Sequence, residues 1–315
     1  MNLFTSLRYL AALHQHKHFG RAADACYITQ PAFSNAIRAL EEEFGTAIVK
    51  RGRAFESFTP EGERIFVSAQ RMLHEQELLL QDLKGKSEQP VGALTLGAVP
   101  SAMPIAARFA GQLQARYPGL SLTVRSMSSQ EIETGLENLT VDIGLGYTER
   151  LKSRAAKLTT LGQYTERYFF LRRAIKPARS SLRRVSRPMS WEMASKLPFC
   201  LLTPEMHNRT IVDSTFRQLG IHVKPVIETN SILTLGLIVL AGEVCSILPG
   251  ALVAVLRGYP ELEAVPLVTP EVVVPIGFMC ASTDRPSNAM RVTLSMANEP
   301  AWLAHIATHT YSFDQ

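Results

Sequence analysis

The residues of this sequence best suited to read DNA bases lie on a predicted helix that follows Thr29. Its apolar side chains recur every three or four residues, which places Phe33, Ile37, Leu40 and Phe44 on one face. Thr29 is a good N-cap, and a proline in the first turn costs no hydrogen bond. The polar residues expected to face DNA are Thr29, Gln30, Pro31, Ser34, Asn35 and Arg38. A helix with an apolar back and a polar front, leading with its N-terminus, fits the major groove.

The neighbouring segments predict the elements that position this helix. An amphipathic segment near the N-terminus predicts a bracing helix, and residues 20–25 predict the first helix of a helix-turn-helix. Ile48-Val49 and Phe58-Thr59 predict two short strands with a turn around Gly52, which would form a wing. Arg51 and Arg53 at this turn are placed for phosphates or the minor groove. The alternative is a solvated basic turn.

Charge alone does not establish a nucleic-acid partner. The chain has 315 residues, a net charge of +5 and a pI near 9.1. Its first 60 residues hold seven Lys/Arg and five Asp/Glu, a net of +2. Since phosphate neutralisation supplies most of the affinity for double-stranded DNA, one copy of this module would bind weakly. We therefore expect a homodimer or homotetramer.

A long helix is predicted to join two such modules. From Glu61 to about Lys86 there is no proline, and glycines lie only at the two ends. Apolar positions alternate in steps of four and three, as in a coiled-coil seam. The seam residues are Ile65, Ala69, Met72, Gln76, Leu79 and Leu83. We expect the seam to pair between subunits; the alternative is packing onto the chain's own domain.

The N-terminal motifs resemble those of LysR-type transcriptional regulators. The similar stretches are LRYLAAL (7–13), F-x-R-A-A-D (19–24), TQPAFSNAIRALEEEFG (29–45), Arg51 and the T-x-x-G of Thr59 to Gly62. Asn35 stands where the family commonly has arginine, which puts base or phosphate contacts at that position in doubt. Ile48-Val49 replaces the usual Leu-Phe, and Thr29 replaces the usual serine before Gln-Pro.

The C-terminal region has the pattern of an α/β fold with a parallel sheet. Predicted strands and helices alternate from Ala93 to about Leu145, and the same rhythm returns from Phe199 to Leu248. A late strand at 272–281 and a final helix from about Asn288 follow. Two halves of similar design suggest a cleft between them.

The resemblance implies a winged helix-turn-helix over 1–60, a dimerisation linker helix over 61–88 and an effector-binding domain over 91–315. That domain would resemble a periplasmic binding protein, with subdomain I at about 91–161 and 268–315 and subdomain II at about 162–267. We place the two crossing strands near Leu161–Gln163 and Leu267–Val268. The implied function is a transcriptional regulator that responds to a small molecule.

Ligands of such sheets bind beyond the carboxyl ends of the strands, against helix N-termini. Hydroxyls, an amide and backbone N–H groups there would donate hydrogen bonds, so we predict a small carboxylate or inorganic oxyanion as effector. The candidate residues are Ser101, Ser128, Ser129, Tyr147, Thr203 and Asn230. The alternative for each Ser or Asn is a plain helix N-cap.

Other functions lack sequence support. No nucleophile–base–acid set has a recognisable spacing, so we do not expect an enzyme. A solute-binding protein would need a signal peptide, which the N-terminus lacks, and no apolar stretch could span a bilayer. We therefore expect a cytoplasmic protein without cofactor or metal. We expect the four cysteines to be buried thiols. We interpret the tract His14-Gln15-His16-Lys17-His18 as the end of a helix and not as a metal site.

A basic stretch from Arg150 to Pro188 carries twelve Lys/Arg and one acid, Glu166. We interpret this stretch as a solvent-exposed basic face, or as an edge that contacts an acidic surface of another subunit in an oligomer. A second DNA contact is a further hypothesis for this stretch.

Overall fold

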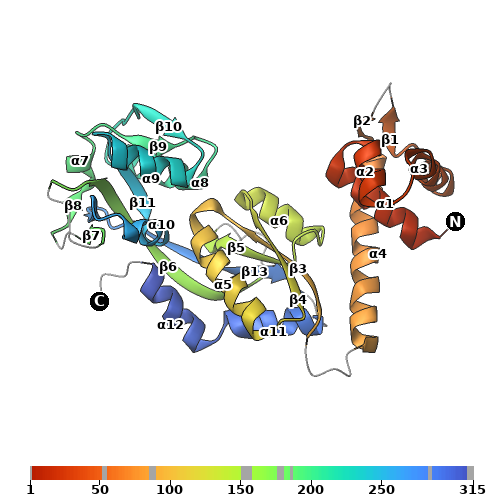
Figure 1. Ribbon diagram of the computed structural model, residues 1–315. Helices are drawn as coiled ribbons and strands as arrows, with labels where there is room; N and C mark the ends of the chain where they lie inside the picture. Colours follow the sequence, from red (N-terminus) through yellow and green to blue (C-terminus); the bar gives the residue numbers. More distant parts are fainter. Residues whose placement is uncertain are drawn as a thin grey trace. The chain divides into compact units, whose positions relative to one another are not determined.

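The chain forms two compact units in the computed structural model. The first comprises Met1–Glu88 and Glu137–Thr140, and the larger comprises Gln89–Leu136 and Val141–Gln315. Figure 1 shows their elements. The structure describes residues 2–51, 55–84, 90–149, 158–175, 181–184, 187–282 and 286–310. Only the backbone is described at residues 51, 78, 81–84 and 183–184. No described helix has both the length and the apolar character needed to cross a membrane.

The first unit confirms the predicted winged helix-turn-helix. Its elements are α1 (Leu3–His16), α2 (Phe19–Ala25), α3 (Gln30–Phe44), β1 (Val49–Arg51), β2 (Phe55–Phe58) and α4 (Pro60–Lys84). Strands β1 and β2 pair antiparallel. Phe33, Ile37 and Leu40 are fully buried in one core with residues of α1, as their spacing predicted. The prediction for Phe44 is wrong: its side chain is 40% exposed, because α3 ends there at the left-handed Gly45.

The junction between the wing and α4 explains the T-x-x-G motif. The Thr59 hydroxyl donates to the Ala47 carbonyl at 2.6 Å and accepts the Gly62 N–H at 2.8 Å, so it caps α4 and holds the loop before β1. A Cβ at residue 62 would lie 2.0 Å from the Ile48 carbonyl oxygen. Helix α4 can therefore approach the wing only with glycine at this position.

The second unit begins with a parallel α/β half. Its elements are β3 (Gly92–Ala98), η1 (Pro100–Ala102), α5 (Met103–Arg116), β4 (Leu120–Ser126), α6 (Ser129–Glu137) and β5 (Ile143–Tyr147). The strands lie in the order β4-β3-β5 and are parallel. Together with β13 and α11 we name them the first half. The alternating strands and helices expected from Ala93 to about Leu145 are present in this half.

A single long strand, β6 (Leu158–Arg173), joins the first half to the rest of the sheet. Its first ten residues pair antiparallel with β13 (Val273–Ala281), which pairs in turn with β5. Residues 169–173 pair with β12 (Leu262–Val268), and residues 168–171 pair with β11 (Ser246–Pro249) on the other edge. The strand therefore crosses from one half to the other, as predicted for this region.

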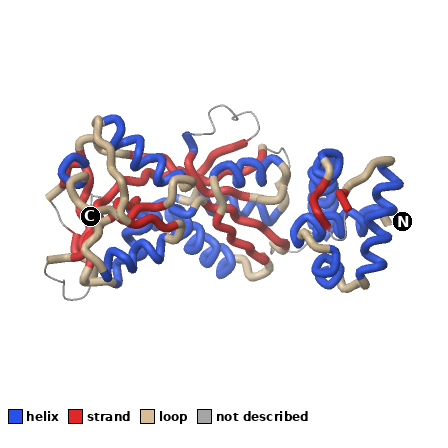
Figure 2. Tube along the Cα trace, turned by 90° about the horizontal axis from the view of Figure 1, so that it is seen from above, coloured by secondary structure: helices blue, strands red, loops and turns tan. Residues whose placement is uncertain are grey.

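The remaining elements form what we name the second half. They are β7 (Arg183–Arg184), β8 (Met189–Ser190), α7 (Trp191–Ala194), β9 (Cys200–Leu202), α8 (His207–Gln218), β10 (Ile227–Thr229), α9 (Ile232–Ala241), β11, α10 (Gly250–Val255), η3 (Leu256–Gly258) and β12. Strands β9 and β10 form a separate parallel pair. Figure 2 shows the strands of this unit flanked by helices.

Three sequence expectations need correction here. Within the rhythm expected from Phe199 to Leu248, the sequence predicts a strand over 223–228; it shortens to β10, because residues 221–225 adopt no regular structure. The second crossing lies at 269–272, between β12 and β13, with a cis Thr269–Pro270 peptide, just beyond the predicted Leu267–Val268. The final helix is two helices, α11 (Asn288–Ala297) and α12 (Pro300–His309), because Pro300 starts a new first turn.

Replacing Gly62 with alanine should destabilise the first unit. The added Cβ meets backbone oxygen rather than a movable side chain, so we expect a loss of about 1–3 kcal/mol or more. Gly111→Ala is the control: a Cβ there meets nothing within 4 Å, and alanine in place of a helical glycine should stabilise by up to about 1 kcal/mol. Urea unfolding followed by circular dichroism measures both. Equal effects would refute the close approach of α4 to Ile48.

Candidate DNA-reading surface and effector cavity

The polar front of α3 is available to DNA. Thr29, Gln30, Pro31, Asn35 and Arg38 are exposed. Ser34 is half-buried beside them. The Thr29 hydroxyl accepts the Ala32 N–H at 3.4 Å, so this residue caps the helix. The other polar side chains project from the helix. The arrangement matches the geometry of a recognition helix whose N-terminal residues meet base edges.

Two side chains of this surface act together. An Arg38 guanidinium nitrogen lies 3.4 Å from the Asn35 amide oxygen, one helical turn away. Asn35 therefore orients the cation that would meet a phosphate or a guanine.

Sequence reasoning missed two residues that belong to this region. Tyr27, in the turn between α2 and α3, is 96% exposed and has a positive φ of 56°. Its hydroxyl is a donor suited to a phosphate. Glu41 accepts the Ile48 and Val49 N–H groups at 3.0 and 3.2 Å, which fixes the wing to α3. A fully exposed aromatic cannot be read from one sequence, and Glu41 looked like one acid of a run of three.

The wing arginines are only partly tested. Arg51 ends β1, and its side chain is not described. Arg53 lies outside the described residues. Their DNA contacts stay a prediction.

Helix α4 divides its seam between two uses. Ala69 is buried in the core of the first unit, and Gln76 accepts a hydrogen bond from Arg8 of α1 at 3.2 Å. Met72 lies between these two residues and Leu79 and Leu80 lie beyond them, and all three are 43–58% exposed. Ala69 and Gln76 of the seam therefore pack onto the chain's own domain, as the alternative held, whereas Met72, Leu79 and the neighbouring Leu80 present exposed apolar surface.

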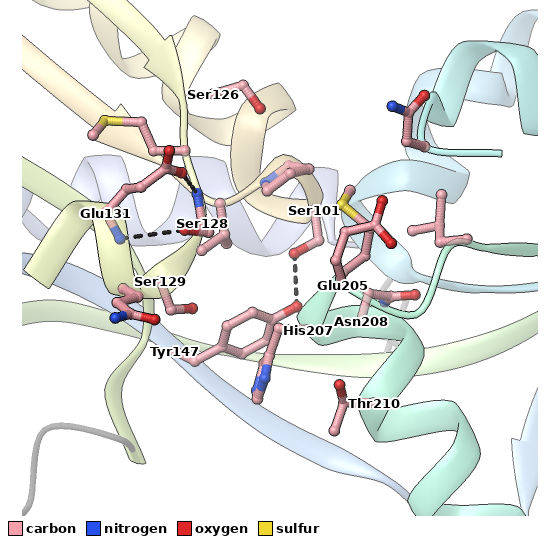
Figure 3. Close-up of a pocket in the computed structure, with 17 residues that line it drawn as sticks. Ser101, Ser126, Ser128, Ser129, Glu131, Tyr147, Glu205, His207, Asn208 and Thr210 are labelled. Atoms are coloured by element: carbon pink, nitrogen blue, oxygen red, sulfur yellow. Dashed lines mark hydrogen bonds between the residues drawn. The ribbon is translucent and has the colours of Figure 1, made fainter. Parts of the chain in front are cut away.

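A cavity of about 670 Å³ lies between the first and second halves of the larger unit (Figure 3). Its lining comes from the segments that follow β3, β4, β9 and β10, together with the last residue of β5. These are the carboxyl ends of parallel strands, where ligands of open α/β sheets bind. Five predicted effector residues line it: Ser101, Ser128, Ser129, Tyr147 and Asn230.

Thr203 is the predicted residue that the structure places outside this lining. Its hydroxyl donates to the Glu205 carboxylate at 2.6 Å. Glu205 itself lines the cavity, and this hydrogen bond lowers the pKa of its carboxyl. Thr203 thus positions a carboxylate at the rim and does not face a ligand directly.

Ser128 and Ser129 are neighbours with different tasks. Ser128 and Glu131 form a capping box at α6: the Glu131 carboxylate accepts the Ser128 N–H at 2.7 Å, and the Ser128 hydroxyl accepts the Glu131 N–H at 3.2 Å. The Ser129 hydroxyl is buried and has no hydrogen-bond partner within the described part of the chain. The N-cap alternative therefore holds for Ser128, and Ser129 is left with an unused donor at the cavity.

Residues that line the cavity from the two halves contact one another, and one of them also contacts the crossing strand. The Ser101 and Tyr147 hydroxyls of the first half lie 2.9 Å apart. The Tyr147 ring meets His207 of the second half edge-on, with ring centroids 4.3 Å apart. Asn208 of the second half donates to the Tyr168 hydroxyl of β6 at 3.2 Å. Burial raises the pKa of Tyr147, which keeps its hydroxyl neutral.

The second-half side of the cavity was mostly missed by sequence reasoning. Glu205, His207, Asn208 and Thr210 line it from the start of α8. They follow β9 at the spacing of a strand-to-helix loop, which was the available signal. Among the described residues that line the cavity, none is lysine or arginine.

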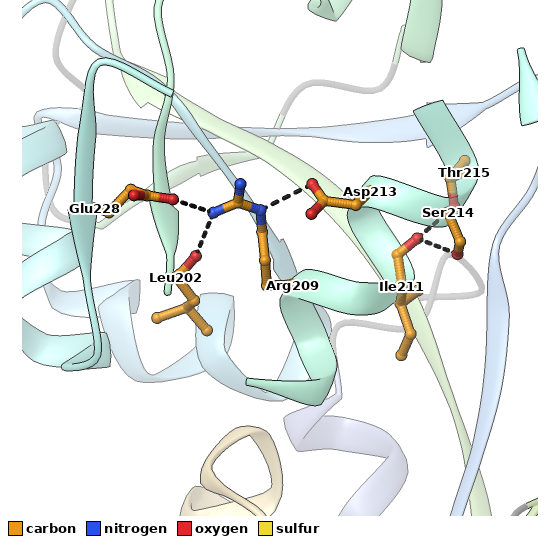
Figure 4. Close-up of polar contacts among 7 residues, drawn as sticks. All are labelled: Leu202, Arg209, Ile211, Asp213, Ser214, Thr215 and Glu228. Carbon is orange, nitrogen blue, oxygen red and sulfur yellow. Dashed lines mark hydrogen bonds and ion pairs between the residues drawn. The ribbon is translucent and has the colours of Figure 1, made fainter. Parts of the chain in front are cut away.

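A buried cation fixes the start of α8 (Figure 4). The Arg209 guanidinium is 8% exposed and binds Asp213 at 2.8 Å and Glu228 of β10 at 2.6 Å. It also donates to the Leu202 carbonyl at 2.7 Å. The ends of β9 and β10 are thereby tied to α8, which holds the cavity residues on either side of Arg209 in place.

The cysteine thiols and the N-terminal histidine tract lie outside the cavity lining. Burial raises the pKa of Cys26, Cys200, Cys245 and Cys280, and none of them lines the cavity. His14 stacks on Phe66 and pairs with Glu63 at 3.2 Å, inside the first unit. The described residues contain no cluster of three metal-ligating side chains.

The basic stretch lies largely outside the described residues. Among its described side chains, Arg167 pairs with Glu271 at 3.0 Å and Arg172 with Glu263 at 2.5 Å. These two cations are used in ion pairs within the second unit. The hypothesis of a second DNA contact remains untested.

Family comparisons agree with this architecture. Residues 4–63 match the bacterial regulatory helix-turn-helix protein, lysR family, and residues 87–301 match the LysR substrate binding domain. The chain therefore belongs to the LysR family of bacterial regulators.

Individual relatives are more distant. The hydrogen peroxide-inducible genes activator of Haemophilus influenzae is 31% identical over 140 residues, which is 44% of this chain and 46% of that protein. The SDS degradation transcriptional activation protein of a Pseudomonas species is 31% identical over 149 residues, which is 45% of this chain and 49% of that protein. The chain thus matches about half the length of these curated relatives.

Solved structures share the whole fold. A full-length OxyR variant from Pseudomonas aeruginosa has a TM-score of 0.69 at 23% identity, covering 95% of this chain and 98% of that one. CbnR complexed with its target DNA has a TM-score of 0.64 at 16% identity, and the match covers 94% of this chain and 98% of that one.

Substituting Ser128 and Ser129 one at a time should distinguish a hydroxyl that caps a helix from one that has no partner. Ser128→Ala removes the capping box and should cost about 0.5–2 kcal/mol of stability. Ser129→Ala removes a buried hydroxyl without a partner and should be neutral or stabilising. Urea unfolding followed by tryptophan fluorescence reports this unit, because Trp191 and Trp302 both lie in it. A costly Ser129→Ala would contradict its assignment as an unused donor.

Proposed function

We propose that this protein is a DNA-binding transcriptional regulator whose hold on promoter DNA responds to a small molecule. The observation that carries the proposal is that α3 exposes its polar face and buries its apolar face. The same chain also contains a polar cavity at the ends of its strands. Family membership supports the same role, which is regulatory and not catalytic.

The proposed DNA-reading residues are Gln30, Ser34, Asn35 and Arg38, with Thr29 and Pro31 shaping the helix start. Arg51 and Arg53 of the wing would add backbone or minor-groove contacts. Tyr27 joins this set because of its exposure.

The proposed domain division is a head over 1–60, a linker helix over 61–88 and a regulatory domain over 91–315, with subdomains parted near 161 and 268. We propose that α4 pairs between subunits through Met72, Leu79 and Leu80, since these apolar side chains are exposed in one copy. Two heads on one dimer would offset the weak charge of each and read a site with dyad symmetry. Dimers that pair into a tetramer are compatible with this arrangement.

The proposed effector is a small anion with a single negative charge. Helix α8 begins without a side-chain cap or an acidic first turn, so its N–H groups favour an anion. The buried Ser129 hydroxyl adds a donor from the opposite half. The Glu131 and Glu205 carboxylates disfavour a multiply charged ligand. Ser101, Tyr147 and Asn230 would complete the contacts.

Peroxide sensing by a cavity thiol is not supported, although several relatives are named for hydrogen peroxide. The thiolate is the form that a peroxide oxidises. The four thiols have raised pKa values, to about 12 for Cys245, and none lines the cavity.

The mechanism follows from where the lining residues originate. A ligand held by Ser129 of the first half and α8 of the second half would favour the arrangement that brings these halves together. The altered second unit would then change how subunits pair, and hence the spacing or bend of bound DNA.

Calorimetry tests the effector class. Small monocarboxylates and nitrate should bind the wild-type protein, and the matched carboxamides should bind at least about tenfold more weakly. Ser129→Ala should weaken the binding of the carboxylate, with Ser195→Ala, distant from the cavity lining, as control. Tighter binding of the carboxamides or of primary amines would overturn the assignment of an anionic effector. Hydrogen peroxide should release no heat on mixing with the protein.

Salt dependence tests the DNA surface. Arg38→Gln should weaken retention of sheared genomic DNA and, if Arg38 meets a phosphate, lower the slope of log K against log salt by about one per head. Arg116→Gln removes the same charge from an ion pair with Glu299 in the other unit and should leave the slope unchanged. Equal slopes for both variants together with equal affinity would contradict the assignment of α3.

A further inference from the structure

The crossing strand carries a buried carboxyl group without a partner. Glu166 is 2% exposed, and neither of its oxygens forms a hydrogen bond in the described structure. It also has no ion-pair partner among the described residues, in contrast to Glu263, which is equally buried but paired with Arg172. An ionised carboxylate in such a place is costly, so the group favours its neutral form.

Three tyrosines surround this carboxyl. Tyr164 and Tyr168 lie two residues before and after it on β6, and therefore on the same face of the strand. The Tyr164 hydroxyl is buried and likewise has no hydrogen-bond partner in the described structure. Tyr147 of β5 is close enough for Glu166 to raise the pKa of its hydroxyl.

Among the described residues, no ion pair reaches Glu166 from the elements packed against it. On β13, its register partner is Val274, and from α10 the backbone N–H of Ala251 approaches. Burial raises the pKa of Glu166 to about 8; the Ala251 N–H and the Tyr164 hydroxyl approach the carboxyl and oppose this shift, but neither reaches hydrogen-bonding geometry.

The position of this group connects it to the cavity. Glu166 lies in the part of β6 that pairs with β13, and Tyr168, two residues on, lies where the strand pairs with β11. The Tyr168 hydroxyl accepts from Asn208, which lines the cavity from the second half. This section of β6 is one of the two connections between the halves.

We propose that Glu166 is a proton-binding site in the crossing strand, and that its protonation is coupled to the occupancy of the adjacent cavity. The neutral acid is compatible with the packed arrangement of Tyr147, Tyr164 and Tyr168. Loss of the proton leaves a buried charge among them and favours rearrangement of the strand on which both halves pivot. The coupling to a ligand rests on the proposed effector cavity; the proton site itself does not.

The pH dependence has a definite sign. Because the pKa of Glu166 is raised in the folded protein, its stabilising effect is fully present below the unfolded value near 4.5 and is lost as pH rises through about 8. Between these values, each pH unit changes the unfolding equilibrium constant by up to about tenfold.

Glu166→Gln replaces the acid with a neutral group of nearly the same shape and tests the site without DNA or effector. The ratio of wild-type to variant unfolding constants should grow about a hundredfold between roughly pH 5.5 and pH 8.5, by urea titration with tryptophan fluorescence. Glu271→Gln, at a half-exposed ion pair near the same strand, is the control and should show no such growth. A constant ratio for Glu166→Gln would overturn the proposal.

The coupling has its own readout. With a carboxylate that binds in the calorimetric panel, heats measured near pH 8 in buffers of different ionisation enthalpy give the protons exchanged on binding. The wild type should exchange protons and Glu166→Gln should exchange none. Equal proton exchange by both would refute the coupling. Absence of binding by every compound would instead count against the proposed effector class and leave the proton site to be decided by the urea titration.

Discussion

The larger unit depends on one continuous strand that belongs to two halves of a sheet. Strand β6 is 16 residues long, and its hydrogen-bond partners change from β13 to β11 and β12 near Tyr168. Neither half could keep its register if this strand slipped by one residue, because every side chain would then exchange faces. The apolar run from Tyr168 to Leu171 is buried on both faces, which fixes that register.

The cavity is a consequence of this arrangement. The parallel strands β3, β4 and β5 end at it from one side, and β9 and β10 from the other, so helix starts and polar loop residues converge there. Arg209 illustrates how the walls are kept rigid, since a single buried guanidinium ties α8 to two strand ends. The carboxyl of Glu166 differs from the Arg209 guanidinium, because neither of its buried oxygens forms a hydrogen bond within the described part of the chain. A buried polar group without a partner, placed on the strand that both halves share, is where a small chemical change would have a structural effect.

The sequence predicts periodic elements well and non-local pairings poorly. The spacing of Phe33, Ile37 and Leu40 determines the buried face of α3, and the same reasoning recovers the α/β rhythm of the first half. It fails for Phe44, where the left-handed Gly45 ends the helix before its apolar face is complete. Strand β6 was expected only as a crossing near residue 161; its full length depends on pairing with strands about 90 to 120 residues away, which no local pattern reveals.

The candidate cavity shows the same division. Serines at strand-to-helix junctions could be anticipated from their positions, but whether each is a cap or an unused donor depends on a single neighbour, as with Ser128 and Glu131. Thr203 had the expected position and the wrong orientation, since its hydroxyl turns to Glu205. His207 and Asn208 enter the cavity only because α8 packs across from β5, a tertiary relationship.

The central claim is that this chain recognises particular DNA sequences, and the sequencing of genomic fragments retained by the purified protein at about physiological salt tests it most directly. The account predicts discrete peaks near promoters that share a motif with dyad symmetry, its half-sites about one or more helical turns apart. Retention spread evenly over the genome, or peaks without a common motif, would contradict it.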